Sequence, residues 1–141
     1  MPEYTRREIR DSAMKLLFET ALRDDPIEEL YAIAEEIDEI IVNEKVRELV
    51  DGTLAHRDTI DAVIDKYSPK RQISRISKLT LSILRLAVYE INYDDGTPTN
   101  AAISEAVALA ETYSCNGDDV RFVNGLLGAY ARDLGKADSE A

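Results

Sequence analysis

The chain has 141 residues, a formal net charge of −11 at pH 7, one cysteine and one histidine. A lone cysteine excludes an internal disulfide, and a lone histidine leaves almost nothing for a zinc site or a histidine-based catalytic dyad, so we expect no metal and no cofactor. Because the N-terminus lacks the apolar run of a signal peptide and no stretch approaches the ~18 uninterrupted apolar residues of a membrane span, we expect one soluble, cytoplasmic domain over residues 1–141.

The first predicted element is a helix over residues 5–23. Thr5 and Glu8 can form a capping box, in which each side chain accepts a hydrogen bond from the other residue's backbone N–H. Three arginines crowd the opening turns of this helix, where the helix dipole disfavours cations: Arg6, Arg7 and Arg10. The helical period places Arg6 and Arg10 close to the direction of the apolar face, so we expect them to project past the end of the core over one edge.

Two interpretations of these arginines stay open on the sequence alone. An arginine-rich segment of this kind can grip the phosphates of a nucleic acid. Alternatively, the guanidinium groups are solvated or paired with carboxylates close by in the chain, namely Glu3, Glu8 and Asp11.

The next two predicted helices are strongly acidic. One covers residues 26–41, with Pro26 at its first helical position, and the other covers residues 44–67 and ends before Pro69. Residues 24–65 contain fourteen acidic and three basic side chains. The second of these helices carries an acidic stripe that is more typical of an exposed face than of a metal site: Asp58, Asp61 and Asp65. We expect the first three helices to form an N-terminal half, residues 1–68.

A basic segment follows at the junction between the predicted halves. Residues 66–85 contain six basic and no acidic side chains. The basic residues are Lys66, Lys70, Arg71, Arg75, Lys78 and Arg85. Tyr67 beside them could stack on a base. This segment is compatible with a nucleic-acid site, with an acidic protein partner or with a solvated linker.

Two further helices are predicted over residues 77–93 and 99–113, and a separate short turn over residues 73–76 precedes them. The last helix is predicted to start at a cap, Asp118 or Asp119, and to end at about Leu134. Cys115 is expected to be an ordinary loop or cap residue. No segment shows the period-two alternation of a strand. The sequence therefore predicts an all-α helical bundle of two three-helix halves, with residues 69–141 as the C-terminal half.

The last predicted helix contains Asn124-Gly125, a pair that is more usual in hairpins. Apolar residues around the pair nevertheless recur at helical spacing, although each interior glycine costs about 1 kcal/mol relative to alanine. Gly125 and Gly128 fall opposite the apolar face, in the same sector as Arg121 and Arg132. Either a neighbouring helix packs over these glycines, or they leave bare backbone that a phosphate can approach closely.

Known catalytic motifs are missing from the chain. It has no Glu-x-x-His pair of a di-iron bundle, no nucleophile elbow, no phosphate-binding loop and no dinucleotide fingerprint. We therefore expect a protein that is not an enzyme and has no catalytic residues.

Three stretches resemble the NusB family of bacterial transcription antitermination factors. The strongest is the RFVNG stretch at residues 121–125, which resembles the basic-Phe-Val-Asn-Gly signature of that family. The second is LRLAVYE at residues 84–90, followed after a loop by AISEAVALA at residues 102–110. The third is the arginine-rich opening helix with LLFE at residues 16–19. Together these stretches extend the resemblance over nearly the whole chain.

The resemblance implies a NusB-like fold that binds boxA-like single-stranded RNA in nascent transcripts together with NusE, a protein of the small ribosomal subunit. Such a complex joins the RNA polymerase antitermination complex and supports read-through of ribosomal RNA operons. The RNA-binding residues that the resemblance implies are Arg6, Arg7, Arg10, Tyr67, Lys70, Asp118, Arg121 and Asn124. The resemblance also favours a NusB protein over the related domain at the front of some RNA cytosine methyltransferases, since no cofactor-binding half follows.

The alternative to an RNA-binding factor is a helical protein-interaction module that binds no RNA. In that case the basic segments meet an acidic protein partner or a second copy of the chain. Alone, the protein is expected to be a monomer or a homodimer. Salt distinguishes the two hypotheses, because an affinity that depends on phosphate contacts falls steeply with ionic strength.

Overall fold

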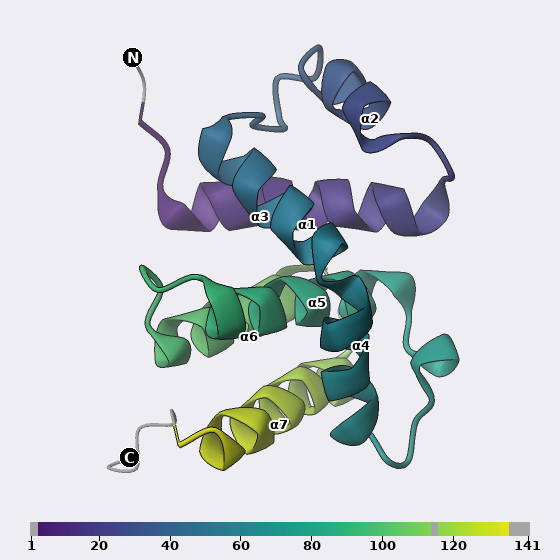
Figure 1. The fold of residues 1–141 in the computed structure, drawn as a ribbon, viewed down its shortest axis with the longest axis vertical. Helices are drawn as coiled ribbons and strands as arrows, with labels where there is room; N and C mark the ends of the chain where they lie inside the picture. The colour runs from purple at the N-terminus through teal and green to yellow at the C-terminus, as the bar shows by residue number, and fades with distance from the viewer. Residues whose placement is uncertain (1–2, 114–115, 136–141) are drawn as a thin grey trace.

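The computed structural model describes residues 3–113 and 116–135, and within these ranges it contains α-helices and one 3₁₀ turn but no strand (Figure 1). The elements are α1 (Arg6–Leu22), α2 (Ile27–Ala34), α3 (Glu44–Ala55), α4 (Arg57–Lys66), the 3₁₀ turn η1 (Ile73–Arg75), α5 (Lys78–Tyr93), α6 (Thr99–Tyr113) and α7 (Gly117–Asp133). The prediction of an all-α fold is confirmed. Cys115 lies outside the described residues.

Side-chain caps fix where several helices begin. The predicted capping box of α1 is present: the Thr5 hydroxyl accepts from the Glu8 N–H, and the Glu8 carboxylate accepts from the Thr5 N–H. At α7 the predicted cap, Asp118 or Asp119, was wrong by two or three residues. The side chain of Asn116 accepts from the N–H of Asp118 and caps the helix, whereas Asp118 and Asp119 lie in its first turn, where the helix dipole favours acids.

The helix predicted over residues 44–67 is divided in two. α3 ends at Ala55, His56 leaves helical geometry with φ −108° and ψ 20°, and α4 starts at Arg57. Apolar residues face the core on both sides of the break, so helical spacing alone gives no sign of it. The His56 ring stacks on Tyr93 at 4.1 Å between ring centroids, which places the break against the end of α5. The N-terminal half thus contains four helices in place of the three predicted.

The helix predicted over residues 26–41 ends early, at Ala34. Four of the five residues that follow are acidic and would repel one another at helical spacing. The chain instead forms turns, and the N–H of Ile41 donates to the Ser12 hydroxyl of α1 at 2.8 Å. Ile37, an apolar residue within the predicted range, is 42% exposed. This correction matters because the acidic turns lie close to the start of α1.

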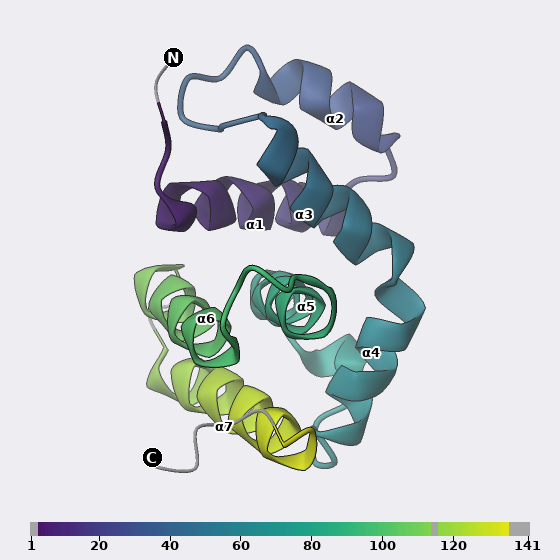
Figure 2. The ribbon, with the colours of Figure 1, turned by 60° about the vertical axis from the view of Figure 1, so that its left-hand side comes forward.

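α5 occupies the centre of the fold. It contacts α1, α3, α4, α6 and α7, and Figures 1 and 2 show α1–α3 on one side of it, α6 and α7 on the other, and α4 alongside. Buried apolar residues from both predicted halves join a single cluster. The division of the chain at residue 68 stays a prediction.

Candidate nucleic-acid interface

Two exposed arginines at the start of α1 reach across to the C-terminal half. The Arg6 Nη1 donates to the backbone oxygen of Gly96, in the loop between α5 and α6, at 2.9 Å. The Arg7 Nε and Nη2 donate to Glu105 Oε1 and Oε2 on α6 at 3.0 and 3.1 Å, a two-pronged ion pair. The expectation that Arg6 projects over the edge of the core agrees with its exposure. The alternative partners close by in the chain do not hold these guanidinium groups.

Arg10 is a correction to the sequence analysis, since it does not project past the core. Only 5% of its surface is exposed, and its Nε donates to Glu90 Oε2 of α5 at 2.8 Å. One helical turn beyond Arg6, α1 already lies over α5, so the side chain points into the molecule. Burial raises the pKa of the Glu90 carboxyl, and the attraction of Arg10 opposes that rise. Arg10 therefore fastens α1 to α5.

The Arg7–Glu105 pair has an asymmetric environment. The Arg7 side chain is 70% exposed, whereas that of Glu105 is 20% exposed. The hydrogen bond from Arg7 lowers the pKa of the Glu105 carboxyl, and the same bond raises the pKa of Arg7. Both residues line a cavity of about 550 Å³ whose other charged lining residues are all carboxylates: Glu8, Asp11, Asp38 and Glu39. The cavity side of Arg7 is thus acidic, and its outer side faces solvent.

In the second basic segment, two arginines are held by contacts within the protein. Arg71 lies over the Phe122 ring, with its guanidinium carbon 4.3 Å from the centroid, and pairs with Asp119 at 3.5 Å. Arg85 makes two hydrogen bonds of 2.8 Å to the carboxylate of Asp61. The predicted acidic stripe on α4 therefore includes a partner of Arg85.

The other cations of this segment face solvent. Lys70, Arg75 and Lys78 are exposed and have no ion pair within the described parts of the chain. Tyr67 is half-buried: its hydroxyl donates to Asp133, and its ring meets the Tyr130 ring edge-on at 5.5 Å between centroids. These contacts fix the orientation of the Tyr67 ring against α7.

The surroundings of Gly125 on the solvent side of α7 distinguish the two interpretations of the Asn124-Gly125 pair. A Cβ atom built on Gly125 would meet nothing within 4 Å, so no helix of the described structure packs over it. Asn124 is exposed beside it. Arg121, also exposed, pairs with Asp118 one turn earlier. Of the two interpretations of these glycines, the packed one is wrong for Gly125, and its backbone is accessible.

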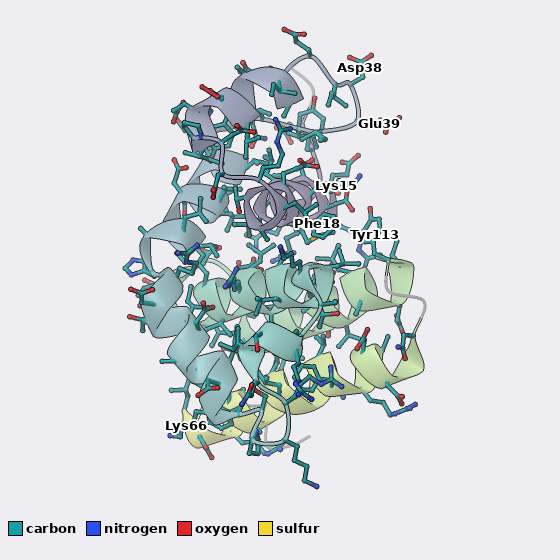
Figure 3. All side chains as sticks on the ribbon, turned by 90° about the vertical axis from the view of Figure 1, so that its right-hand side faces the viewer. Lys15, Phe18, Asp38, Glu39, Lys66 and Tyr113 are labelled. Carbon is teal, nitrogen blue, oxygen red and sulfur yellow. The ribbon has the colours of Figure 1, made fainter. Side chains whose placement is uncertain are left out.

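The structure places the two basic segments on opposite sides of the molecule. In Figure 1 the start of α1 lies at the left, beside the loop that joins α5 to α6, while η1 and its flanking loops lie at the right. The α6–α7 pair connects them, because Arg7 binds Glu105 on α6 and Arg71 binds Asp119 on α7. Figure 3 shows Asp38, Glu39 and Tyr113 along one edge of the molecule and Lys66 far from them. Tyr67 and Lys70 are therefore not in contact with the arginines of α1.

Sequence reasoning missed the acceptors that hold the α1 arginines. Glu90 and Glu105 lie eighty and ninety-eight residues beyond their partners. Both belong to stretches that carry the family resemblance, but spacing along the chain cannot pair residues so far apart. Within the described residues, no three His, Cys, Asp or Glu side chains are grouped to hold a metal ion. No described helix combines the length and apolar character needed to cross a bilayer.

Comparison with known proteins identifies the family. The sequence model of the NusB family matches residues 7–132. The chain is 38% identical over 138 residues to the transcription antitermination protein NusB of Natranaerobius thermophilus, which covers 94% of this chain and 99% of that protein. It is also 40% identical over 127 residues to the NusB of Acetivibrio thermocellus, across 87% of this chain and 86% of that one.

A solved structure gives the same result. A crystal structure of the antitermination factors NusB and NusE with double-stranded RNA is similar to this fold, with a TM-score of 0.79 and 27% identity over 91% of this chain and 96% of the matched one. Sequence and fold agree over nearly the full length of the proteins compared. The chain belongs to the NusB family.

Proposed function

We propose that the protein is a transcription antitermination factor that binds boxA-like single-stranded RNA together with NusE and supports read-through of ribosomal RNA operons. Membership of the NusB family over almost the whole chain carries this proposal. The related complex of NusB, NusE and double-stranded RNA supports both partners. The single-stranded form of the RNA, the boxA sequence and the ribosomal operons rest on the family resemblance.

The exposed cations give the proposal its chemistry. Four exposed side chains can donate charge-assisted hydrogen bonds to phosphates. They are Arg6 and Arg7 at the start of α1, Lys70 in the loop after α4, and Arg121 on α7. Asn124 and the open backbone at Gly125 let a strand approach α7 closely. Asp118 and Tyr67 border this path.

We assign Arg10 a supporting part in this site. Because its side chain is buried against Glu90, it acts by holding α1 in place. The acidic side of the molecule, formed by the region from α2 to α4, repels a polyanion and restricts RNA to the other side.

The test is the affinity of the purified protein for a boxA-like RNA and for a scrambled RNA of the same length, with and without NusE, at two salt concentrations. We expect selective binding that NusE strengthens and that salt weakens. A duplex of the same sequence should bind less well than the single strand. The variant Arg7→Glu should lower the affinity for the boxA-like RNA about tenfold or more, because it removes a charge-assisted phosphate contact and adds a repulsion.

Arg57→Glu is the matched control. Arg57 is an exposed arginine at the start of α4, and it has no ion pair among the described residues. The same reversal of charge there should change the affinity little. Equal, weak binding of both RNAs that neither NusE nor Arg7→Glu alters would refute the proposal and favour an acidic protein partner for the basic segments.

A further inference from the structure

We propose that Glu105 is an internal competitor for RNA: its carboxylate occupies the phosphate-binding edge of Arg7, and RNA binds by displacing it. This inference rests on the proposed RNA-binding function. It adds a residue that sets affinity and that carries the opposite charge from the arginines and the lysine expected to bind phosphates.

The geometry of the pair supports the competition. Arg7 uses Nε and Nη2 together, at 3.0 and 3.1 Å, to bind both oxygens of Glu105. A phosphate binds a guanidinium in the same two-pronged way through two of its oxygens. The carboxylate and a phosphate therefore compete for the same pair of donors.

The exposure of the two side chains indicates that Arg7, and not Glu105, moves when RNA binds. Glu105 lies on α6 and is mostly covered, whereas the Arg7 side chain is 70% exposed and free to turn. On its cavity side Arg7 faces the carboxylates of Glu8 and Asp11, which repel an approaching polyanion. RNA must therefore meet Arg7 from the solvent side, after the guanidinium has turned away from Glu105.

The two neighbouring arginines show why Arg7 is the exchangeable one. Arg10 is buried with Glu90, and separating them would leave an unpaired charge inside the protein. Arg6 binds a neutral carbonyl oxygen, which a charged phosphate replaces at little cost. Of the three, Arg7 combines a charged partner with an exposed position.

Competition of this kind favours a long anion over a short one. A free phosphate gains little by taking the place of the Glu105 carboxylate, because it only exchanges one anion for another at the same Arg7 donors. An RNA strand that is already held by Lys70 and Arg121 presents a phosphate further along the same strand to Arg7 at a raised effective concentration. Glu105 thus discriminates against small anions and weakly held RNA.

The experiment is a double-mutant cycle on RNA affinity with Glu105→Gln, Arg7→Gln and the double variant, using the boxA-like RNA and NusE. Glutamine keeps the size of Glu105 and removes its charge. We expect Glu105→Gln to raise the affinity about two- to fivefold, the range set by the strength of an exposed ion pair. In the Arg7→Gln background the same substitution should have almost no effect on the affinity, because the guanidinium N–H groups for which Glu105 and RNA compete are missing.

Glu36→Gln is the matched control, since it removes one negative charge from an exposed residue that has no ion pair within the described chain. It should leave the affinity unchanged. Circular dichroism and thermal unfolding of each variant ensure that affinities are compared between folded proteins. A gain that persists in the Arg7→Gln background would overturn the proposal, because it would show a general effect of charge.

The failure of this inference can be told apart from failure of the proposed function. If the wild-type protein binds the boxA-like RNA and Arg7→Gln weakens it, but Glu105→Gln brings no gain, competition is refuted and the function stands. If neither the wild type nor Glu105→Gln binds any RNA, both are refuted.

Discussion

Two helical glycines have opposite surroundings, and the difference predicts opposite effects of one substitution. A Cβ atom on Gly52 of α3 would lie 2.3 Å from the Tyr89 hydroxyl oxygen and 2.4 Å from the adjoining ring carbon. Tyr89 cannot withdraw easily, because it is 7% exposed and its ring stands beside those of His56 and Tyr93. Gly125 on α7 has nothing within 4 Å of the same position.

We expect Gly52→Ala to lower the free energy of unfolding by about 1–3 kcal/mol, the usual cost of overpacking a core. Gly125→Ala should raise it by up to about 1 kcal/mol, because alanine is the better helix former and meets no obstacle. Urea unfolding of the two variants and the wild type measures both changes. Effects of the same sign in the two variants would contradict this account.

The contact between α1 and α5 depends on one buried ion pair. Arg10 and Glu90 have side chains that are 6% and 3% exposed, at an N–O distance of 2.8 Å. Removing Arg10 leaves a buried carboxylate without its partner, at a typical cost of about 3–5 kcal/mol. Because α1 also carries Arg6 and Arg7, this pair sets the position of the proposed RNA contacts.

The stability loss of Arg10→Ala should depend on pH. Burial raises the pKa of Glu90 and Arg10 opposes the rise, so its removal raises that pKa further. A carboxyl whose pKa is higher in the folded state than in the unfolded state binds more protons when folded. The free energy of unfolding therefore falls as the pH rises from the pKa of the unfolded state, about 4.3, through the pKa of the folded state. We therefore expect a larger loss relative to wild type at pH 7 than at pH 5, measured by urea unfolding.

Glu90→Gln in the Arg10→Ala background is the control for this titration. The double variant lacks the titrating carboxyl, so the loss that Arg10→Ala causes, measured against Glu90→Gln alone, should be the same at the two pH values. An equal loss at both pH values in Arg10→Ala itself would show that Glu90 is not responsible.

Local signals in the sequence predicted most single elements, with errors at the end of α2 and the start of α7, and they failed more seriously where distant segments meet. The capping box of Thr5 is a local feature of α1, and the apolar spacing around Asn124 is a local feature of α7. Both predictions agree with the structure. The break at His56 has no local signal, because it depends on packing against Tyr93. Arg10 was misplaced for the same reason: its partner Glu90 lies on another helix, eighty residues away.

At the scale of the whole molecule, the distribution of charge constrains how a polyanion can bind. Residues 24–65 contain fourteen acidic and three basic side chains, whereas residues 66–85 contain six basic and none acidic. The start of α1 and the turn η1 lie on opposite sides of the fold (Figure 1), and α1 alone is about 25 Å long at 1.5 Å per residue. For an RNA that contacts both the start of α1 and the second basic segment, we propose a path over α7, which carries Arg121 and Arg132, and away from the acidic region between α2 and α4.

RNA length tests this path. For an RNA of about twelve nucleotides, Arg7→Glu and Lys70→Glu should each lower the affinity, and their effects should add in the double variant because the two sites are far apart. For an RNA of about five nucleotides, which engages one end, only one of the two substitutions should matter. Fluorescence anisotropy with labelled RNAs measures both, with Arg57→Glu as the control. If Lys70→Glu leaves the affinity for the longer RNA unchanged, RNA is bound at the Arg7 end alone, and the second basic segment is free to bind a protein partner.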